Sequence, residues 1–341
     1  MKAFVTGATG FVGSAVVRCL LRRGVSVRVL ARPTSDLRNL AGLAVELFYG
    51  DLLDSEGLAR ALDSCDALYH VAGYYSTAVA ESATMYEVNV RGTKSILNAA
   101  LKAGVRRVVH TSTIGTIGQP PDEALATEDT PFNLWDSASD YVKSKYLGEL
   151  VALGMCDRGL PVVVVNPCAP VGPRDIKPTS TGQRIVDYLQ RKRPSFVAGG
   201  INYVAVGDVA EGEVLAMEKG RAGERYILGN RQGNLSLEGF CGIMERLSGI
   251  RLPRARPHPL SLLRGTRWRA TGGRDRDLRP TALTCDPSKA IRELGLPQTP
   301  LQEAFAEAIA WFRENGYVDS WGEADRVTGQ TLGSSPEERD A

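Results

Sequence analysis

The sequence predicts an α/β fold with a doubly wound parallel β-sheet and helices on both faces of the sheet. Short apolar runs rich in valine alternate with amphipathic helical segments along much of the 341-residue chain. This alternation is typical of parallel strands joined by helical crossovers. The first apolar run, residues 2–5, leads directly into a glycine-rich turn and a helix. After Pro167 the periodicity changes and prolines become frequent, which predicts a second, smaller α+β part.

The glycine-rich turn lies between the first strand and a helix expected over residues 11–23. Its first glycine can adopt a left-handed turn, the second leaves room for a pyrophosphate, and the third lets the helix pack close to the strand. Free amides at the start of the helix would face the phosphates. Such turns are common, and a purely structural turn is the alternative. The flanking strand and helix favour a dinucleotide site made by Gly7, Thr9, Gly10, Phe11, Val12 and Gly13.

The composition argues against several classes of protein. Lys and Arg total 41 against 39 Asp and Glu, a net charge of +2, so the charge balance does not indicate nucleic acid or an anionic membrane as a partner. Six scattered cysteines and three histidines predict neither a disulfide framework nor a metal site. A strand beginning at residue 2 leaves no room for a signal peptide, and no apolar run approaches the roughly 18 residues of a membrane span. We therefore expect a cytoplasmic protein without an integral membrane segment.

The second strand, residues 25–31, ends at Arg32. In nucleotide-binding folds of this kind, an acidic residue at this point binds the ribose 2′-hydroxyl and favours NAD, whereas an arginine can accept a 2′-phosphate. The acid is absent here. We therefore expect NADP(H) to be favoured over NAD(H), with Arg32 at the 2′-phosphate. An ordinary solvated arginine is the alternative.

The next segments complete the predicted sheet. The fourth strand runs into Ala72 and Gly73, which are small enough to let the backbone lie against a cofactor. His70, within that strand, is expected to be structural and receives no chemical role. The third, fourth and fifth strands are expected at residues 45–49, 67–71 and 106–112, and a long helix is expected at residues 83–103.

A tyrosine and a lysine four residues apart carry the predicted chemistry. Tyr141 and Lys145 lie near the start of a helix, so they share one of its faces. The pKa of a tyrosine is near 10, and a nearby positive charge is needed before the phenol can exchange protons at neutral pH. Lys145 would supply this charge and could also hold the nicotinamide ribose. Thr113, just after the fifth strand, would form a hydrogen bond with the substrate oxygen. A chance pairing is the alternative.

These motifs, in this order, resemble the extended short-chain dehydrogenase/reductases, also called the NAD-dependent epimerase/dehydratase family. The resemblance extends to about residue 318 and implies a Rossmann-type fold. It implies that Asp51 and Leu52 meet the adenine ring and that Asn89 joins its helix to the active-site strand. We also place Asn166 and Pro167, at the end of the sixth strand, against the cofactor. The family pairs through its long helices, which makes a homodimer an open expectation.

Within the family, the stretches at residues 25–36, 163–179 and 182–188 resemble the hopanoid-associated sugar epimerases, and the arginine after the second strand resembles dihydroflavonol 4-reductases. Three positions depart from the usual pattern. Ala205 stands where a histidine is usual, Gly207 where an aspartate is usual, and Thr113 where serine is commoner. The threonine keeps the hydroxyl. The other two changes put a structural contact between the domains in doubt.

We expect three parts in the chain. Residues 1–166 with 201–222 would form the NAD(P)-binding Rossmann domain, residues 167–200 with 223–318 a smaller α+β substrate-side domain, and residues 319–341 a disordered polar tail. Arg174 and Lys177 are candidate substrate residues, with a solvated basic edge as the alternative. The arginine-rich segment 264–279 is expected to be a solvated loop and not a nucleic-acid site.

Three functions remain open at this stage. The first is a reductase or alcohol dehydrogenase that moves a hydride between nicotinamide C4 and a carbinol or carbonyl carbon of a small-molecule substrate. The second is a sugar epimerase that oxidises a hydroxyl and returns the hydride to the other face. The third is a non-catalytic NADP-binding sensor on the same fold. The presence of both Tyr141 and Lys145 argues against the sensor.

Overall fold

The structure is a computed structural model that describes residues 1–121, 124–252 and 282–318, and its largest element is a seven-stranded sheet. Every neighbouring pair of strands in this sheet is parallel. The strand order reverses between β1 and β4, as it does in doubly wound folds. The predicted fold class is confirmed. Across the sheet the strands are β3 (Glu46–Tyr49), β2 (Ser26–Ala31), β1 (Lys2–Thr6), β4 (Ala67–His70), β5 (Arg107–Thr111), β6 (Val162–Pro167) and β9 (Arg225–Leu228).

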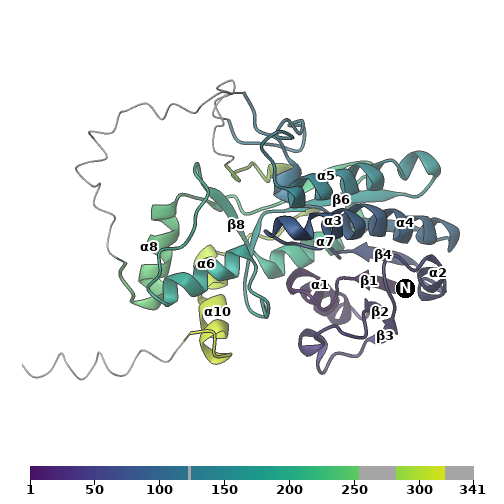
Figure 1. Cartoon of the computed structure of the whole chain (residues 1–341), viewed down its shortest axis with the longest axis horizontal. Coiled ribbons are helices and arrows are strands. Elements are labelled where there is room, and N and C mark those ends of the chain that lie inside the picture. Colours follow the sequence, from purple (N-terminus) through teal and green to yellow (C-terminus); the bar gives the residue numbers. More distant parts are fainter. Residues whose placement is uncertain (122–123, 253–281, 319–341) are drawn as a thin grey trace, which may run out of the picture.

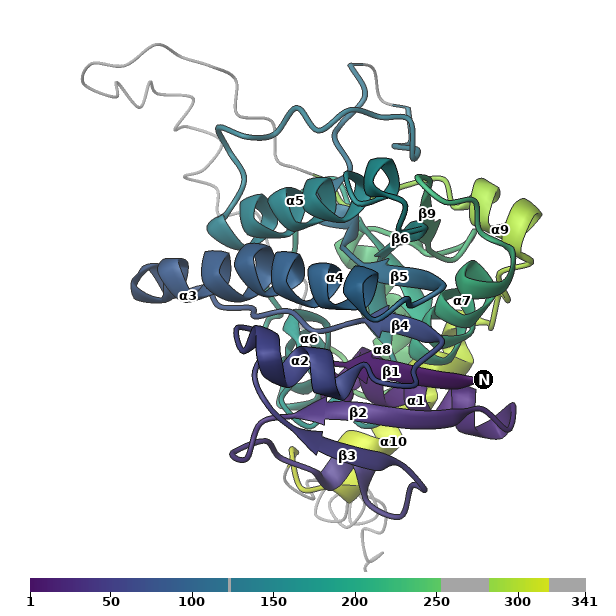
Figure 2. The same cartoon turned by 90° about the vertical axis from the view of Figure 1, so that its right-hand side faces the viewer.

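Helices cover both faces of the sheet, and each face has its own apolar core (Figure 2). In β6, Val163 and Val165 belong to one core while Val162 and Val164 belong to the other. Side chains of a strand alternate between faces, so an unbroken run of valines supplies both cores at once. One face carries α1 (Phe11–Arg22), α7 (Val206–Lys219) and α9 (Ser288–Leu294), and the other carries α2 (Ser55–Ala61), α4 (Thr93–Lys102) and α5 (Asp140–Leu153).

A smaller sheet with a third apolar core lies beside the large one (Figure 1). Its strands β7 (Ala169–Val171) and β8 (Ile201–Ala205) are parallel, and β8 pairs antiparallel with β10 (Asn234–Leu235). Tyr203, Phe240 and Phe305 pack at its centre with ring centroids 5.4–5.8 Å apart. Its helices are α6 (Ser180–Leu189), α8 (Leu237–Ser248) and α10 (Leu301–Glu314). In the residues that the structure describes, no helix is long and apolar enough to cross a bilayer.

Two strands lie in a different sheet from the one expected. Residues 201–222 were predicted to belong to the Rossmann part, but within them only α7 packs on the large sheet, while β8 pairs in the small one. Conversely, β9 falls in the predicted substrate-side segment 223–318 and is the seventh strand of the large sheet. The cause is the position of α7. Because α7 packs against α1 on the face of the large sheet, the strand that follows it is brought beside β6.

The helix expected over residues 83–103 forms, but it is not regular. A π-helical turn, η3 (Glu87–Gly92), separates α3 (Ser82–Tyr86) from α4. Asn89 lies within this turn, and π turns inside helices often occur at functional sites. Short 3₁₀ turns complete the described structure: η1 (Arg38–Leu40), η2 (Val79–Glu81), η4 (Ile114–Thr116) and η5 (Cys156–Arg158).

Ala205 and Gly207, which depart from the usual family pattern, do not prevent α7 from contacting the segment before α10. Asp208 is buried, and its carboxylate accepts hydrogen bonds at 2.7 Å from both the main-chain N–H and the hydroxyl of Thr299. This bond links the start of α7 to the segment that leads into α10. The doubt raised by Ala205 and Gly207 therefore does not extend to this connection.

Glycine sets how closely α1 approaches the loop before it. Gly7 has a φ of 70°, in the left-handed region. A Cβ atom added to Gly13 would lie 2.1 Å from the carbonyl oxygen of Gly7, far inside contact distance. The first turn of the helix can therefore lie directly on the loop only because residue 13 has no side chain.

We predict that Gly13→Ala destabilises the protein, because the added methyl group must push α1 off the loop. The expected loss in the free energy of unfolding is about 1–3 kcal/mol, as for other overpacked sites. Gly207→Ala is the control. It also lies in a helix, but a Cβ there meets nothing within 4 Å, so the change should be neutral or stabilising by up to about 1 kcal/mol. Chemical denaturation would measure both, and equal stabilities of the two variants would contradict the packing argument.

Candidate active site

The glycine-rich loop lies against the end of β4. A Cβ on Gly7 would be 2.6 Å from the main-chain nitrogen of Ala72, so these two predicted cofactor residues are direct neighbours. Gly10 begins α1 without a side-chain cap, and the first turn of α1 contains no acidic residue. By contrast, Ser139 and Thr179 cap α5 and α6 with their hydroxyls. The amides at the start of α1 are therefore free to bind an anion.

The ends of β5 and β6 meet beside this loop. The side-chain amide of Asn166 donates to the carbonyl oxygen of Thr113 at 3.2 Å and to the hydroxyl of Thr116 at 3.0 Å. Asn166 is fully buried, and within the described part of the chain its Oδ1 has no hydrogen-bond partner. Pro167 ends β6 at the same edge. The structure thus brings the predicted residues of both strand ends together.

Asn89 connects the π turn to two other elements. Its Nδ2 donates to the main-chain oxygen of Tyr74 and to the hydroxyl of Ser144, both at 2.9 Å, while its Oδ1 accepts from the Tyr74 N–H at 2.7 Å. Tyr74 follows β4 and Ser144 lies in α5. Asn89 therefore fixes the position of the tyrosine-bearing helix relative to the end of β4.

Tyr141 and Thr113 meet at the end of β5. Burial raises the pKa of Tyr141 to about 12, Tyr75 adds to this increase, and the hydrogen bond with the Thr113 side chain opposes it. Tyr75 packs edge-on against the ring of Tyr141 at a centroid distance of 4.9 Å. Sequence reasoning missed Tyr75, whose place next to Tyr141 depends on the loop after β4 and not on any motif.

Lys145 lies one turn further along α5 and is only 4% exposed. Its ammonium donates to the main-chain oxygen of Thr111 at 2.7 Å, and no hydrogen bond joins it to Tyr141 among the described residues. Burial lowers the pKa of Lys145 to about 8, against the opposing charges of Glu149 and Glu213. The lysine therefore remains protonated at neutral pH.

Both acids near Lys145 were absent from the sequence prediction. Glu149 is buried, where it accepts hydrogen bonds from Thr116 and Asn166 and forms an ion pair with Arg225. Glu213 of α7 accepts a hydrogen bond from the Thr111 hydroxyl at 2.5 Å, and burial raises its pKa to about 8. The spacing of Glu149 from Lys145, one more helical turn, was a usable signal. Glu213 reaches the site from a helix on the other face of the sheet.

His70 has the structural role expected of it. Its two ring nitrogens contact the hydroxyls of Thr6 and Thr93 at 2.8 and 2.9 Å. Burial, followed by the charge of Lys145, lowers its pKa to about 3. The ring is therefore neutral and helps to fix β4 between β1 and α4.

The residues predicted to face the adenosine lie at the ends of β2 and β3. Arg32 is exposed, and its main-chain N–H donates to Ser35. Asp51 is exposed and accepts from the N–H of Leu53, while Leu52 packs against the apolar core under α2 and α4. These side chains line the same edge of the sheet as the glycine-rich loop.

Arg174 and Lys177, the candidate substrate residues, are not brought together. Both are exposed. The main-chain oxygen of Arg174 accepts from Asn39, which also binds the main-chain oxygen of Thr9 in the glycine-rich loop. The charge of Lys177 instead contributes to lowering the pKa of Glu81. Arg174 thus lies on the cofactor side and Lys177 near the loop after β4.

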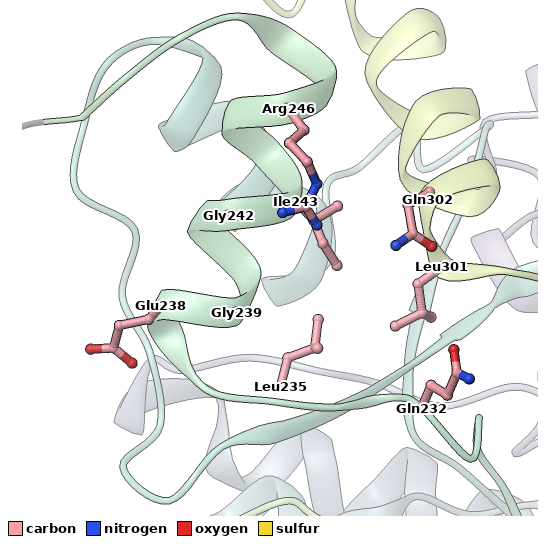
Figure 3. A pocket seen from close by; sticks show the side chains of 9 residues that line it. All are labelled: Gln232, Leu235, Glu238, Gly239, Gly242, Ile243, Arg246, Leu301 and Gln302. Carbon is pink, nitrogen blue, oxygen red and sulfur yellow. The ribbon is translucent and has the colours of Figure 1, made fainter.

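A groove in the smaller part of the molecule is separate from these residues. It lies between α8 and α10, has a volume of about 300 Å³ and includes none of the predicted site residues (Figure 3). Two other sequence predictions, the arginine-rich loop 264–279 and the tail 319–341, fall outside the described residues.

A doubly wound sheet with a glycine-rich first turn defines a dinucleotide-binding α/β protein. Residues 3–229 match the model of the NAD dependent epimerase/dehydratase family. The chain belongs to this family, as the sequence motifs indicated.

Related proteins match nearly the whole chain. A protein of Synechocystis sp. named dihydroflavonol 4-reductase is 39% identical over 331 residues, which are 92% of this chain and 95% of that protein. Sterol demethylase protein B of Methylococcus capsulatus is 37% identical, with 93% and 100% covered. Among solved structures, gox2253 has a TM-score of 0.81 at 39% identity and covers 93% of this chain and 99% of its own. DesIV, a dTDP-glucose 4,6-dehydratase from Streptomyces venezuelae with NAD and TYD bound, has a TM-score of 0.77 at 29% identity, with 94% and 99% covered.

The chain is accordingly an NAD(P)-dependent enzyme with the oxidoreductase chemistry of the extended short-chain dehydrogenase/reductases. Its residues fit such a cofactor on structural grounds. The start of α1 has no side-chain cap, and the space over the glycine-rich loop would be filled by a Cβ atom at Gly7 or Gly13. Asn166 Oδ1 has no hydrogen-bond partner in the described part of the chain.

Proposed function

We propose that this protein transfers a hydride between nicotinamide C4 and the carbon of a secondary alcohol or carbonyl group, as a reductase or dehydrogenase. The observation that carries the proposal is the placement of Tyr141 and the buried Lys145 one helical turn apart in α5. The Thr113 side chain is near enough to oppose the rise in the pKa of Tyr141. The similarity to a named dihydroflavonol 4-reductase supports net oxidoreduction. The substrate is a small molecule.

In this proposal each side chain has one task. Bound NADP(H) supplies or accepts the hydride. Thr113 holds the substrate oxygen by a hydrogen bond, and Tyr141 donates a proton to that oxygen during reduction and removes it during oxidation. The pKa of Tyr141, raised to about 12 by burial, is too high for a base at neutral pH. In the cofactor complex, the positive ring of the oxidised nicotinamide, together with the ammonium of Lys145, would lower it, because a positive charge stabilises the phenolate.

The cofactor would be held along the edge of the large sheet. The free amides after Gly10 bind its diphosphate, with Thr9, Phe11, Val12 and Gly13 completing the loop. Leu52 and Asp51 lie against the adenine, and Arg32 binds a 2′-phosphate. Ala72, Asn89, Asn166 and Pro167 surround the nicotinamide end, where Lys145 and Tyr141 hold the ribose.

We also propose a two-domain organisation, in which the three-stranded sheet with α6, α8 and α10 is the substrate-side domain. The large sheet then carries the cofactor and the catalytic side chains, and the substrate lies between the two. A cytoplasmic location and a homodimer formed through the long helices α4 and α5 complete the proposal.

Replacing Tyr141 by phenylalanine should leave cofactor binding intact and reduce turnover by about two orders of magnitude or more, the usual size of a general acid/base contribution. Lys145→Met should weaken both, because in this proposal the lysine holds the ribose and adds to the positive charge beside the phenolate. Cofactor titration and steady-state rates would measure the two effects. Normal turnover by the phenylalanine variant would refute the assignment of Tyr141.

Arg32 should make the enzyme prefer NADP(H) over NAD(H) by about 1.5–3 kcal/mol, as expected for a charge-assisted contact with a phosphate. In Arg32→Ala this preference should disappear, while the affinity for NAD(H) stays unchanged. Fluorescence titration with both cofactors provides the test. A preference for NADPH that persists in the alanine variant would show that Arg32 is only a surface residue.

The alternative function is a nucleotide-sugar epimerase of the hopanoid-associated type, which would use the same three residues. It is supported by the structural similarity to a protein from Pseudomonas aeruginosa described as a nucleoside-diphosphate-sugar epimerase, which has a TM-score of 0.75 at 29% identity. The two functions differ in net consumption of cofactor, because an epimerase returns the hydride to its substrate in each cycle whereas a reductase must release oxidised cofactor.

We expect aldehydes or ketones to consume NADPH in a substrate screen that follows nicotinamide absorbance and product stereochemistry together. Nucleotide sugars are the comparison set in the same screen. Inversion of a sugar carbon with no net change in nicotinamide would establish the epimerase instead. Tight binding of NADP(H) with neither reaction would favour the sensor.

A further inference from the structure

A buried asparagine joins the glycine-rich loop to the loop after β7. Asn39, in η1, is 2% exposed. Its Nδ2 donates to the main-chain oxygens of Thr9 and Arg174, each at 3.2 Å, and its own main-chain oxygen accepts from Arg18 Nη2 at 2.8 Å. The opposite amide orientation would place Oδ1 against two carbonyl oxygens, so these contacts determine the orientation. Asn39 therefore connects two loops that belong to different sheets.

Arg174 is held in an unfavourable backbone conformation. Its φ of 77° lies in the left-handed region, which costs a non-glycine residue about 1 kcal/mol or more. Asn39 holds the carbonyl of Arg174. On the other side, the buried Asp175 accepts hydrogen bonds of 2.8–3.0 Å from the N–H and hydroxyl of Thr179. Strain of this kind persists where the surroundings enforce it, and it is concentrated at ligand sites.

The side chain of Arg174 adds a positive charge near a second one. Burial, followed by the charges of Arg174 and Arg22, lowers the pKa of Arg18 in α1. Within the described residues neither Arg18 nor Arg174 forms an ion pair with a carboxylate. The Nε donor of Arg18 is also buried without a partner in that part of the chain. Two like charges without a counter-ion, which Asn39 joins to the loop before α1, favour an anion.

We propose that Arg174 binds a phosphate group of the dinucleotide cofactor, and that Asn39 is the positioning residue that holds Arg174 beside the glycine-rich loop. This inference rests on the proposed function and changes the role of Arg174 from a substrate residue to a cofactor residue. A guanidinium suits the task because its planar N–H groups match phosphate oxygens. A loop next to the smaller sheet would then complete the cofactor site.

Calorimetric titration of the purified chain with phosphate-bearing and phosphate-free ligands tests the role of Arg174. The cofactor-type ligands are NADP⁺, NAD⁺, ADP, 2′,5′-ADP and adenosine, and UDP-glucose is titrated beside them as the nucleotide-sugar comparison. Arg174→Ala should weaken the phosphate-bearing ligands by about 10- to 100-fold, the effect of one charge-assisted hydrogen bond, and leave adenosine unchanged. Arg174→Lys should restore part of the loss. If Arg174→Ala also weakens the binding of ADP, Arg174 contacts the diphosphate. If it weakens only NADP⁺ and 2′,5′-ADP, Arg174 contacts the 2′-phosphate.

Arg22→Ala is the matched control. This exposed arginine also lies in α1 near Arg18, so its removal changes the net charge equally without removing a proposed ligand. Unchanged affinity of Arg174→Ala for every cofactor ligand would overturn the proposal, as would a loss seen only with a nucleotide sugar such as UDP-glucose. Failure of the wild-type chain to bind any dinucleotide would instead refute the proposed function itself.

A double-mutant cycle tests the positioning role of Asn39. Asn39→Leu removes both hydrogen bonds, and Asn39→Ser is a smaller change for use if the leucine variant does not fold. Either variant should weaken NADP⁺ binding about as much as Arg174→Ala does. The variant that carries both substitutions should bind NADP⁺ only slightly more weakly than either single variant, because both substitutions remove the same contact. Losses that add in full would show that Asn39 does not act through Arg174.

Discussion

The absence of side chains at Gly7 and Gly13 is the constraint on which the rest of the structure depends. It lets the first turn of α1 lie on the loop after β1 and lets the same loop touch Ala72 at the end of β4. The uncapped amides of α1 are thereby aimed at the edge where β4, β5 and β6 end. Thr113, Asn166 and the helix bearing Tyr141 converge on this edge through independent contacts. In the proposed binding mode, the glycines would therefore align the diphosphate end of the cofactor with the residues proposed to act at its nicotinamide end.

Local patterns were sufficient to predict the parallel sheet and the placement of Tyr141 and Lys145 on one helix. Valine runs identify buried strands, and a spacing of four residues places Tyr141 and Lys145 on one helical face whatever the helix packs against. The same spacing would have identified Glu149. Motifs of this kind depend only on neighbours in sequence. For that reason they could be recognised without knowledge of the tertiary structure.

The features that could not be predicted all depend on contacts between distant segments. Glu213 reaches Thr111 across 102 positions, so nothing in the pattern of α7 marks it as part of the site. The π turn at Asn89 inserts one residue into an otherwise regular helix and leaves the apolar pattern nearly unchanged. The exchange of β8 and β9 between the two sheets depends on where α7 packs. The contact that joins Arg174 to Asn39 spans 135 positions, so no local pattern could indicate that Arg174 lies beside the glycine-rich loop.

The order of β8, α7 and β9 along the chain also determines whether the molecule can be divided into separate fragments. The chain leaves the large sheet after β6, builds two strands of the small one, returns through α7 and β9, and then leaves again for β10. Neither sheet is therefore encoded by one continuous stretch. A fragment ending near residue 166 would lack β9 and α7 and would expose the apolar face that α7 covers. Neither sheet can therefore be removed from the chain by a single cut, since the segments that build each one are interleaved along the sequence.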